Sequence, residues 1–194
     1  IKHVDGAAKA FGMPMGPITL YDVVGLDTAL FAGSVMHDAF PDRVLASALL
    51  EAMVKAGRLG QKSKVGFFAY KEKSDKGEPD PTFDAFLQPY LKPSPAKLDP
   101  QTITNRLFLP MLLEATRVLA EKKVRDPRDV DLGLIFGIGF PPFKGGLLFW
   151  ADTLGAAKIV EMLKPLEGLG ARFQPTPLLL DLAKSGKKFY ELNG

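Results

Sequence analysis

The chain has 194 residues, of which 46% are hydrophobic and 24% charged, so it can bury one large core or two smaller ones. Its net charge of +3 is spread over short pairs such as Lys122-Lys123, without the sustained basic stripe that nucleic-acid binding requires. The lack of cysteine excludes disulfides, thiolate metal sites and cysteine nucleophiles, and no apolar run reaches the roughly 18 residues of a membrane-spanning helix.

Glycine and proline divide the N-terminal part of the chain into short helices. Lys2 to Phe11 has the pattern of the last turns of a helix, with Gly12 as its C-terminal cap. Because the chain begins at Ile1 inside this helix, without an initiator methionine, we expect it to be a piece of a longer protein. Pro17 suits the first position of the next helix, and Gly25 predicts a break between two helices set at an angle.

The middle of the chain changes from helical to irregular. Residues 43–57 have helical periodicity, whereas Gly66 to Lys71 predicts a short extended segment. The polar stretch Lys71 to Asp80 predicts a surface excursion, and Asp80-Pro81 predicts the start of a short helix. The proline-containing stretch Lys92 to Leu98 is the best linker, so we place the domain boundary there.

Three further pairs of a capping side chain and a proline mark helix starts in the second half: Asp99-Pro100, Asp126-Pro127 and Thr176-Pro177. The first of these helices should run to about Lys122, with a kink at Pro110. Its apolar periodicity predicts that one face is buried, consisting of Ile103, Leu107, Met111, Ala115, Val118 and Leu119.

Two stretches of the chain resemble each other, Phe11 to Gly25 and Phe136 to Gly155. After a three-residue insertion, three residues of the first stretch match three of the second at a constant offset of 130 (146 − 16 = 152 − 22 = 155 − 25): Gly16 with Gly146, Asp22 with Asp152, and Gly25 with Gly155. This pattern predicts a mainly α fold built from one helical unit used twice.

Gly137-Ile138-Gly139 begins like a dinucleotide-binding fingerprint but lacks the preceding strand and the third glycine. Pro141 and Pro142 also remove two backbone amides where a pyrophosphate needs donors. We therefore interpret this segment as a tight structural loop.

The remaining polar candidates have no catalytic spacing. His3 and His37 lie far apart without a serine or carboxylate partner, and Asp22 and Asp27 are better explained by capping and loop hydrogen bonds near Gly25. Asn105, on the long helix, needs a partner, for which a hydrogen bond near the helix end or solvent is the simplest explanation.

Four segments resemble the C-terminal helical domains of 3-hydroxyacyl-CoA dehydrogenases: FGMPMGPITLYDVVGLD, GRLGQKSKVGFFAY, NRLFLPMLLEATRVLAEK and FGIGFPPFKGG. They occur in the family's order and cover nearly the whole chain. Their tandem arrangement is similar to that of multifunctional fatty-acid β-oxidation enzymes, namely the trifunctional-protein α-subunit and its bacterial and peroxisomal relatives.

The resemblance implies two tandem helical domains, residues 1–97 and 98–194, of which the first lacks its first helix. It also implies NAD-dependent oxidation of the 3-hydroxyl of an acyl-CoA. The Rossmann domain that binds NAD and supplies a catalytic histidine and glutamate is expected upstream of Ile1, as is an enoyl-CoA hydratase domain. The chain is therefore expected to hold no catalytic, NAD-binding or metal-binding residues and to be inactive alone.

In the family that this chain resembles, an active-site asparagine lies in an N-R-x-x-x-P helix of the first helical domain. That helix is cut off in this chain. Asn105, Arg106 and Pro110 match that pattern in the second unit. We expect their role to be structural, because the second unit resembles a substitute for the partner subunit of the dimeric single-function enzymes.

Met13, Pro14, Met15, Gly16 and Pro17 form the candidate substrate-binding loop, because the first unit is expected to close against the Rossmann domain. Core filling by the two methionines is the alternative. The expected partners are acyl-CoA, the missing Rossmann and hydratase domains, and a thiolase subunit. A non-catalytic docking module and an acyl-CoA-binding module are the alternative functions. The bacterial cytoplasm is the leading compartment, with mitochondria and peroxisomes as alternatives.

Overall fold

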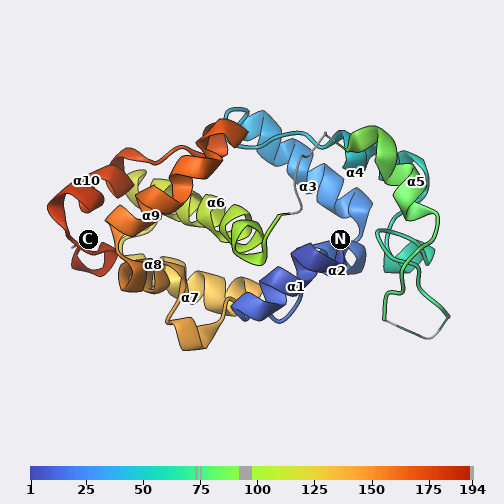
Figure 1. The fold of residues 1–194 in the computed structure, drawn as a ribbon, viewed down its shortest axis with the longest axis horizontal. Coiled ribbons are helices and arrows are strands. Elements are labelled where there is room, and N and C mark those ends of the chain that lie inside the picture. Colours follow the sequence, from blue (N-terminus) through green and yellow to red (C-terminus); the bar gives the residue numbers. More distant parts are fainter. Residues whose placement is uncertain (73, 75, 92–97, 193–194) are drawn as a thin grey trace. The chain divides into compact units, whose positions relative to one another are not determined.

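The computed structural model describes residues 1–72, 74, 76–91 and 98–192, and within them the secondary structure is helical (Figure 1). Strand-like pairing in these residues is limited to three isolated bridges, Gly60–Val65, Val65–Ala69 and Ala69–Glu78. The mainly α fold is therefore confirmed, and the extended segment expected at Gly66 to Lys71 forms bridge contacts rather than a strand. The α-helices are α1 Lys2–Phe11, α2 Pro17–Val24, α3 Leu26–Ala39, α4 Ala48–Lys55, α5 Phe83–Leu87, α6 Pro100–Ala120, α7 Pro127–Ile138, α8 Leu147–Leu154, α9 Ala156–Leu163 and α10 Pro177–Ser185.

The chain divides into two compact units. Unit 1 comprises Ile1–Gly6 and Met15–Leu98, and unit 2 comprises Ala7–Pro14 and Asp99–Gly194. The sequence did not indicate that residues 7–14 belong with the second half. The linker expected at Lys92 to Leu98 lies, apart from Leu98, outside the described residues. That the two units are copies of one helical domain stays a prediction.

Local capping sets three helix starts in the second half of the chain. Asp99 accepts a hydrogen bond from the Thr102 amide at 2.9 Å, Asp126 from the Arg128 amide at 2.8 Å, and Thr176 from the Leu179 amide at 3.4 Å. Each cap is followed by proline at the first helical position, so these three predicted starts are confirmed. The start predicted at Asp80-Pro81 differs from the structure, because α5 begins at Phe83.

Two sequence-based helix predictions are wrong in part. The helix expected over residues 43–57 is limited to α4, because the Ser47 hydroxyl caps it by accepting from the Leu50 amide at 3.2 Å. On α6, only Ala115 of the predicted face is fully buried. The core instead buries Phe108, Leu109, Leu112, Leu113, Ala115 and Thr116 of that helix, because α8, α9 and α10 all pack against it.

The break at Gly25 is confirmed, since α2 and α3 meet at an angle of 103°. Gly25 has φ 97°, a backbone conformation that favours glycine. Among the described residues no single helix is long and apolar enough to cross a membrane, although α2 and α3 counted together pass that test of length and composition.

Each unit has its own core. The unit 1 core is small and partly aromatic, formed by Leu26, Met53, Phe67, Phe68, Tyr70 and Phe83. The unit 2 core is larger and centres on α6, α8, α9 and α10. The C-terminal end of α1 belongs to it, because the ring of Phe11 stacks on Phe108 with 3.8 Å between centroids and meets Trp150 edge-on at 5.2 Å.

Candidate functional site

The Met13–Pro17 loop connects α1 to α2, and its residues fall on both sides of the division into units. In unit 2, Met13 packs against the core and Pro14 is exposed. In unit 1, Gly16 is buried while Met15 and Pro17 are half-buried. Core filling, the alternative reading of the methionines, therefore describes Met13.

Close packing against glycine fixes the unit 2 part of the loop. Gly12 has φ 118°, and a Cβ there would lie 2.5 Å from the Phe143 ring. A Cβ at Gly139 would lie 2.9 Å from the Pro14 ring. Larger residues at either glycine would force the loop or its neighbours to move.

A buried carboxylate fixes the unit 1 part. Asp5 of α1 accepts hydrogen bonds from the amides of Ile18 and Thr19 at 2.8 and 3.0 Å, and from the Thr19 hydroxyl at 2.6 Å. Gly16 is the N-cap residue of α2 but has no side chain that could accept these hydrogen bonds. Asp5 therefore caps α2 from outside that helix. A Cβ at Gly16 would lie 2.2 Å from the Asp5 carboxyl carbon, so the contact requires glycine.

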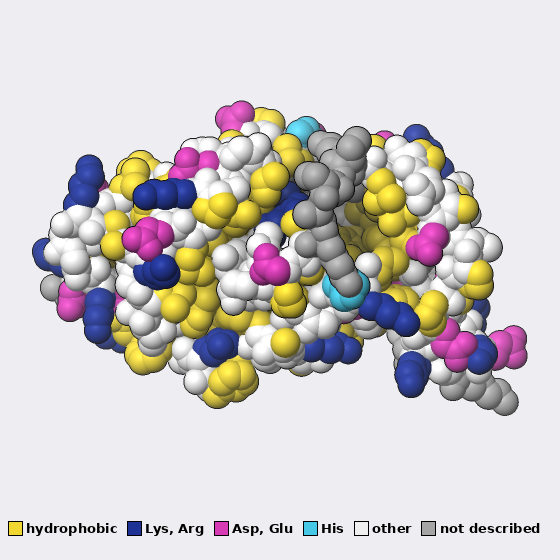
Figure 2. Space-filling model, in the orientation of Figure 1, with side chains coloured by type: hydrophobic (Ala, Val, Ile, Leu, Met, Phe, Trp, Pro, Cys, Tyr) yellow, Lys and Arg dark blue, Asp and Glu magenta, His cyan; other side chains and the backbone are white. Residues whose placement is uncertain are grey.

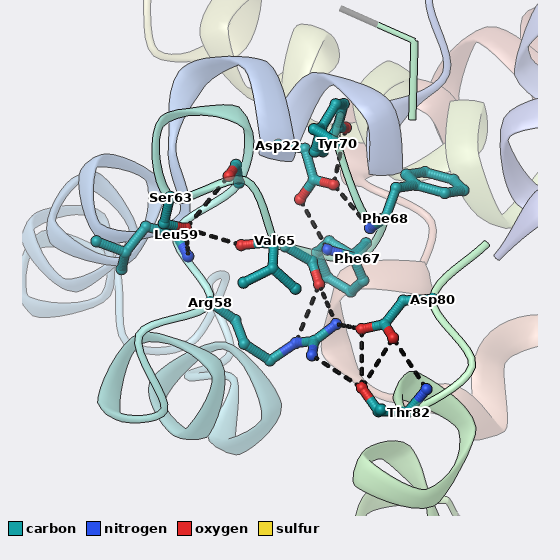
Figure 3. A network of polar contacts seen from close by, with 12 residues as sticks. Asp22, Arg58, Leu59, Ser63, Val65, Phe67, Phe68, Tyr70, Asp80 and Thr82 are labelled. Atoms are coloured by element: carbon teal, nitrogen blue, oxygen red, sulfur yellow. Dashed lines mark hydrogen bonds and ion pairs between the residues drawn. The ribbon is translucent and has the colours of Figure 1, made fainter. Parts of the chain in front are cut away.

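Asp22 of α2 is the centre of a second buried network (Figure 3). Its carboxylate accepts from the amides of Phe67 and Phe68 at 2.8 and 2.9 Å and from the Tyr70 hydroxyl at 2.9 Å. Burial raises the pKa of Asp22, although the hydrogen bonds and the charge of Arg58 partly offset this rise. Burial and the Asp22 carboxylate both raise the pKa of Tyr70, so its hydroxyl remains a donor.

Arg58 organises the other side of the same network (Figure 3). Its Nε and Nη2 atoms donate to the Gly66 carbonyl at 3.0 and 2.6 Å, and Nη2 also pairs with Asp80 at 2.6 Å. The guanidinium lies 5.3 Å and 5.5 Å from the ring centroids of Phe83 and Phe86. Arg58 therefore holds the irregular segment after α4 against α5.

Unit 2 contains the same arrangement of carboxylates. Asp131 accepts from the amides of Leu148 and Phe149 at 2.7 and 2.9 Å, and a Cβ at Gly146 would lie 2.2 Å from its carboxyl carbon. Asp152 accepts from the amides of Phe189 and Tyr190 at 2.7 and 3.0 Å. The tyrosine contact differs between the units: the hydroxyl of Tyr70 donates to Asp22 in unit 1, whereas the hydroxyl of Tyr190 donates to Asp131, the counterpart of Asp5, at 2.8 Å.

These carboxylates are structural rather than catalytic. Asp5, Asp22, Asp131 and Asp152 all accept paired backbone amides, an arrangement that anchors helices and loops. Asp27 accepts from the Thr28 amide and pairs with Lys62, so the interpretation of Asp22 and Asp27 as loop and capping residues is confirmed.

Sequence reasoning missed Asp5, Arg58 and Asp131. The signal that could have identified the two aspartates was the glycine at each helix start that they cap, Gly16 and Gly146, since the repeat aligns these glycines.

Two of the other polar candidates, Asn105 and His37, have local partners. Asn105 accepts from Gln101 at 2.8 Å within α6, which supports the structural reading of this residue. Nδ1 of His37 contacts the Val44 carbonyl at 2.7 Å, and His3 is exposed on α1. Across the described residues, no group of three or more histidine or acidic side chains could hold a metal ion.

The Gly137–Gly139 segment is the C-terminal end of α7. Gly139 has a left-handed backbone conformation, and its amide donates to the Leu134 carbonyl. The amide of Phe140 donates to the same carbonyl at 3.1 Å. The segment thus follows a helix rather than a strand, as the structural-loop interpretation requires.

The chain is similar in sequence to a known protein family and to two bacterial proteins described below. The family model described as 3-hydroxyacyl-CoA dehydrogenase, C-terminal domain, matches residues 1–70 and 103–191. The chain is 38% identical over 193 residues to the fatty acid oxidation complex subunit alpha of Pseudomonas putida (strain GB-1), and 40% identical to that of Pseudomonas aeruginosa (strain LESB58). Each match covers 97% of this chain but 27% of the relative, so the chain spans about a quarter of the length of these proteins.

Two solved structures share the fold. The 3-hydroxybutyryl-CoA dehydrogenase from Escherichia coli K12 matches with a TM-score of 0.70 and 19% identity, covering 95% of this chain and 55% of that chain. The dehydrogenase part of multifunctional enzyme 1 from C. elegans matches with a TM-score of 0.66 and 23% identity, covering 94% of this chain and 42% of that chain.

Proposed function

The chain belongs to the 3-hydroxyacyl-CoA dehydrogenase C-terminal domain family, and from this premise we propose that it is the helical part of an NAD-dependent 3-hydroxyacyl-CoA dehydrogenase in fatty-acid β-oxidation. The family match in both halves of the chain is the observation that carries the proposal. The names of the relatives, which refer to a fatty acid oxidation complex, support the pathway. Their bacterial origin favours the bacterial cytoplasm as the compartment.

In this proposal NAD binds to another domain of the longer enzyme. The described residues do not fit a dinucleotide at the one glycine-rich loop that resembles its fingerprint. The amides of Gly139 and Phe140 donate to the Leu134 carbonyl, and Pro141 and Pro142 have no amide hydrogen. No hydride-transfer step is therefore assigned to residues of this chain.

The Met13–Pro17 loop is the proposed contact with the acyl-CoA. Each part of the loop is fixed within its own unit, because Met13 packs against the unit 2 core and Gly16 packs against Asp5 in unit 1. Pro14 is exposed. A segment fixed by such contacts loses little conformational entropy when a substrate binds it.

The test of this loop is Met15→Asp in an enzyme extended upstream through the Rossmann domain, assayed by NADH oxidation with acetoacetyl-CoA. We expect a rise in KM of about tenfold, because an added carboxylate repels an anionic thioester and removes apolar contact. Lys9→Asp, at an exposed position of α1, is the matched control. Equal KM and kcat in the two variants would refute the role of the loop.

The family-level proposal has a separate test. The 194-residue chain and the extended protein are compared in the same assay, and activity is expected in the extended protein alone. Activity of the 194-residue chain would show that the cofactor site has been placed in the wrong domain.

A docking role for α2 and α3 has its own support, namely exposed apolar side chains. Phe31 is 73% exposed, Val35 52% and Met36 48%. Figure 2 shows hydrophobic side chains on the face turned to the viewer. Contiguous apolar surface of this kind marks an interaction site. We propose that other domains of the same longer chain cover it, with a thiolase subunit as a further partner of the assembled enzyme.

A further inference from the structure

Unit 2 contains a cleft that the proposed dehydrogenase function does not use. Its volume is about 550 Å³, within the usual range for small-molecule sites. It lies where α6 ends and where α7 and α10 begin, and none of its lining residues belongs to the Met13–Pro17 loop. The residues that matter to the argument are Leu119, Val124, Leu178, Leu192, Lys122 and Arg125.

The wall of the cleft is largely apolar. Leu119 comes from the last turn of α6, Leu178 from the first turn of α10, and Leu192 from the segment after α10. All three are half-buried, as is Val124. The cleft therefore offers apolar surface that a hydrocarbon chain can cover.

Two cationic side chains, Lys122 and Arg125, line the same cleft. Lys122 and Arg125 are exposed, and within the described part of the chain neither side chain has a hydrogen bond or an ion pair. The adjacent acid, Asp126, already pairs with Arg128 at 2.9 Å and caps α7. Positive charge beside apolar surface favours a ligand with a hydrocarbon part and an anionic head.

The helix ends at the cleft have opposite effects on its preference for an anion. The N-termini of α7 and α10 present the positive ends of two helix dipoles, whereas the C-terminus of α6 presents a negative end. The last carbonyls of α6 are partly satisfied, because the amides of Lys122 and Lys123 donate to Leu119 and Val118 at 3.0 Å. Because Asp126 also caps the N-terminus of α7, the side chains of Lys122 and Arg125 are the main attraction for an anion at this cleft.

We propose that this cleft binds an acyl chain with an anionic head group, with Leu119, Leu178 and Leu192 covering the chain and Lys122 and Arg125 contacting the head. The head is a carboxylate in a free fatty acid or the phosphates of an acyl-CoA. This site is separate from the substrate contact proposed for the Met13–Pro17 loop, so neither inference depends on the other.

The backbone at Lys122 supplies a variant that preserves the fold. Lys122 has φ 54°, a left-handed conformation in which glycine is favoured over residues with a side chain. Lys122→Gly therefore removes the cation while relieving the backbone. Combined with Arg125→Gln, it removes both charges from the cleft. Lys123→Gln is the matched control, because Lys123 is exposed and does not line the cleft.

The experiment titrates the 194-residue chain with dodecanoate below its micelle concentration and follows amide and methyl resonances by NMR. We expect saturable shifts at Val124, Leu178 and Leu192, and a dissociation constant at least about tenfold higher in the Lys122→Gly/Arg125→Gln variant than in Lys123→Gln. Equal affinity in the two variants, or no saturable shift at those residues, would overturn the proposal.

Three further ligands identify the chemistry. Dodecanol should bind at least about tenfold more weakly than dodecanoate, because it lacks the charge. Dodecanoyl-CoA binding more tightly than dodecanoate would identify the thioester as the natural source, and the reverse order would identify the free acid. Coenzyme A without an acyl chain should not shift the cleft resonances, and binding as tight as that of dodecanoyl-CoA would contradict the proposal.

Discussion

Buried and half-buried aspartates hold backbone amides at several points of this chain. Asp5 and Asp131 each cap a helix to which they do not belong, and Asp22 and Asp152 each bind two amides of a distant loop. The same four positions would be candidate acids or bases if only residue types were considered. Their donors assign them to stability, because a carboxylate surrounded by amide donors is held for structure rather than proton transfer.

The contrast between Asp22 and Asp27 provides a test. Asp22→Asn places an NH2 group against a donor in a buried site and should lower the free energy of unfolding by about 1–3 kcal/mol. Asp27→Asn removes an exposed pairing with Lys62 and should leave stability nearly unchanged. Urea unfolding followed by circular dichroism measures both. Equal effects of the two substitutions would contradict the structural role of Asp22.

Asp80 gives a pH-dependent prediction. Burial favours its neutral form, but hydrogen bonds from the Thr82 amide, Arg58 and the Thr82 hydroxyl together hold its pKa below the ordinary 3.8. The folded state then binds fewer protons than the unfolded state, so the stability that Asp80 contributes is present above the unfolded pKa. It is lost as the pH falls through the lower folded pKa.

The stability difference between the wild type and Asp80→Asn should accordingly be largest near about pH 7 and shrink below about pH 4. Urea unfolding at several pH values measures it, and other titrating groups cancel in the difference. A difference that does not vary with pH would mean that the pair of Asp80 with Arg58 is not responsible.

At the scale of the elements, glycine has two opposite roles in unit 2. Gly133 lies in the exposed interior of α7, where a Cβ would meet nothing within 4 Å. Gly146 caps the start of α8 with φ 111° and touches the Asp131 carboxyl group. The first position weakens its helix, and the second makes a helix contact feasible.

Gly133→Ala should therefore raise the free energy of unfolding by about 1 kcal/mol, since alanine has the better helix propensity. Gly146→Ala should lower it by about 2 kcal/mol or more, because the backbone is left-handed and the added carbon would meet Asp131. Thermal unfolding of the two variants checks both signs. Destabilisation by Gly133→Ala would show that α7 tolerates no side chain at that position.

At the scale of the whole molecule, helix α1 contributes to both compact units. Residues 1–6 belong to unit 1 through contacts such as those of Asp5, and residues 7–14 belong to unit 2. Phe11 is the largest side chain of that second part, and it contacts Phe108, Phe140 and Trp150. Residues 99–194 thus complete their core with a segment from the other end of the chain.

Phe11→Ala should lower the free energy of unfolding of unit 2 by about 3 kcal/mol. This value is the lower end of the range for replacing a core phenylalanine by alanine, and it applies because Phe11 is half-buried. Trp150 is the single tryptophan, so its fluorescence reports on this unit and should shift to longer wavelength as the ring gains water contact. Phe31→Ala, at a 73% exposed side chain of α3, is the control. An unchanged Trp150 signal in Phe11→Ala would exclude Phe11 from the unit 2 core.

Much of the local structure followed from sequence signals that act over three or four residues. Asp99, Asp126 and Thr176 with their prolines predicted three helix starts, and Gly25 predicted a break, because caps and backbone restrictions are local. The start of α4 was predicted incorrectly, and the buried face of α6 was predicted only in part. The first depended on the cap at Ser47, and the second on which helices pack around α6.

The sequence by itself determined the mainly α class, several helix starts and the family, since repeated glycines and motifs are readable along the chain. It also nominated the Met13–Pro17 loop, whose contact with substrate stays a proposal. Only the tertiary structure decided that residues 7–14 complete unit 2, that Asp5 and Asp131 cap distant helices, and that Lys122 and Arg125 share one cleft. The physical reason is distance along the chain: these contacts join residues that no local rule relates, and they exist only once the helices pack.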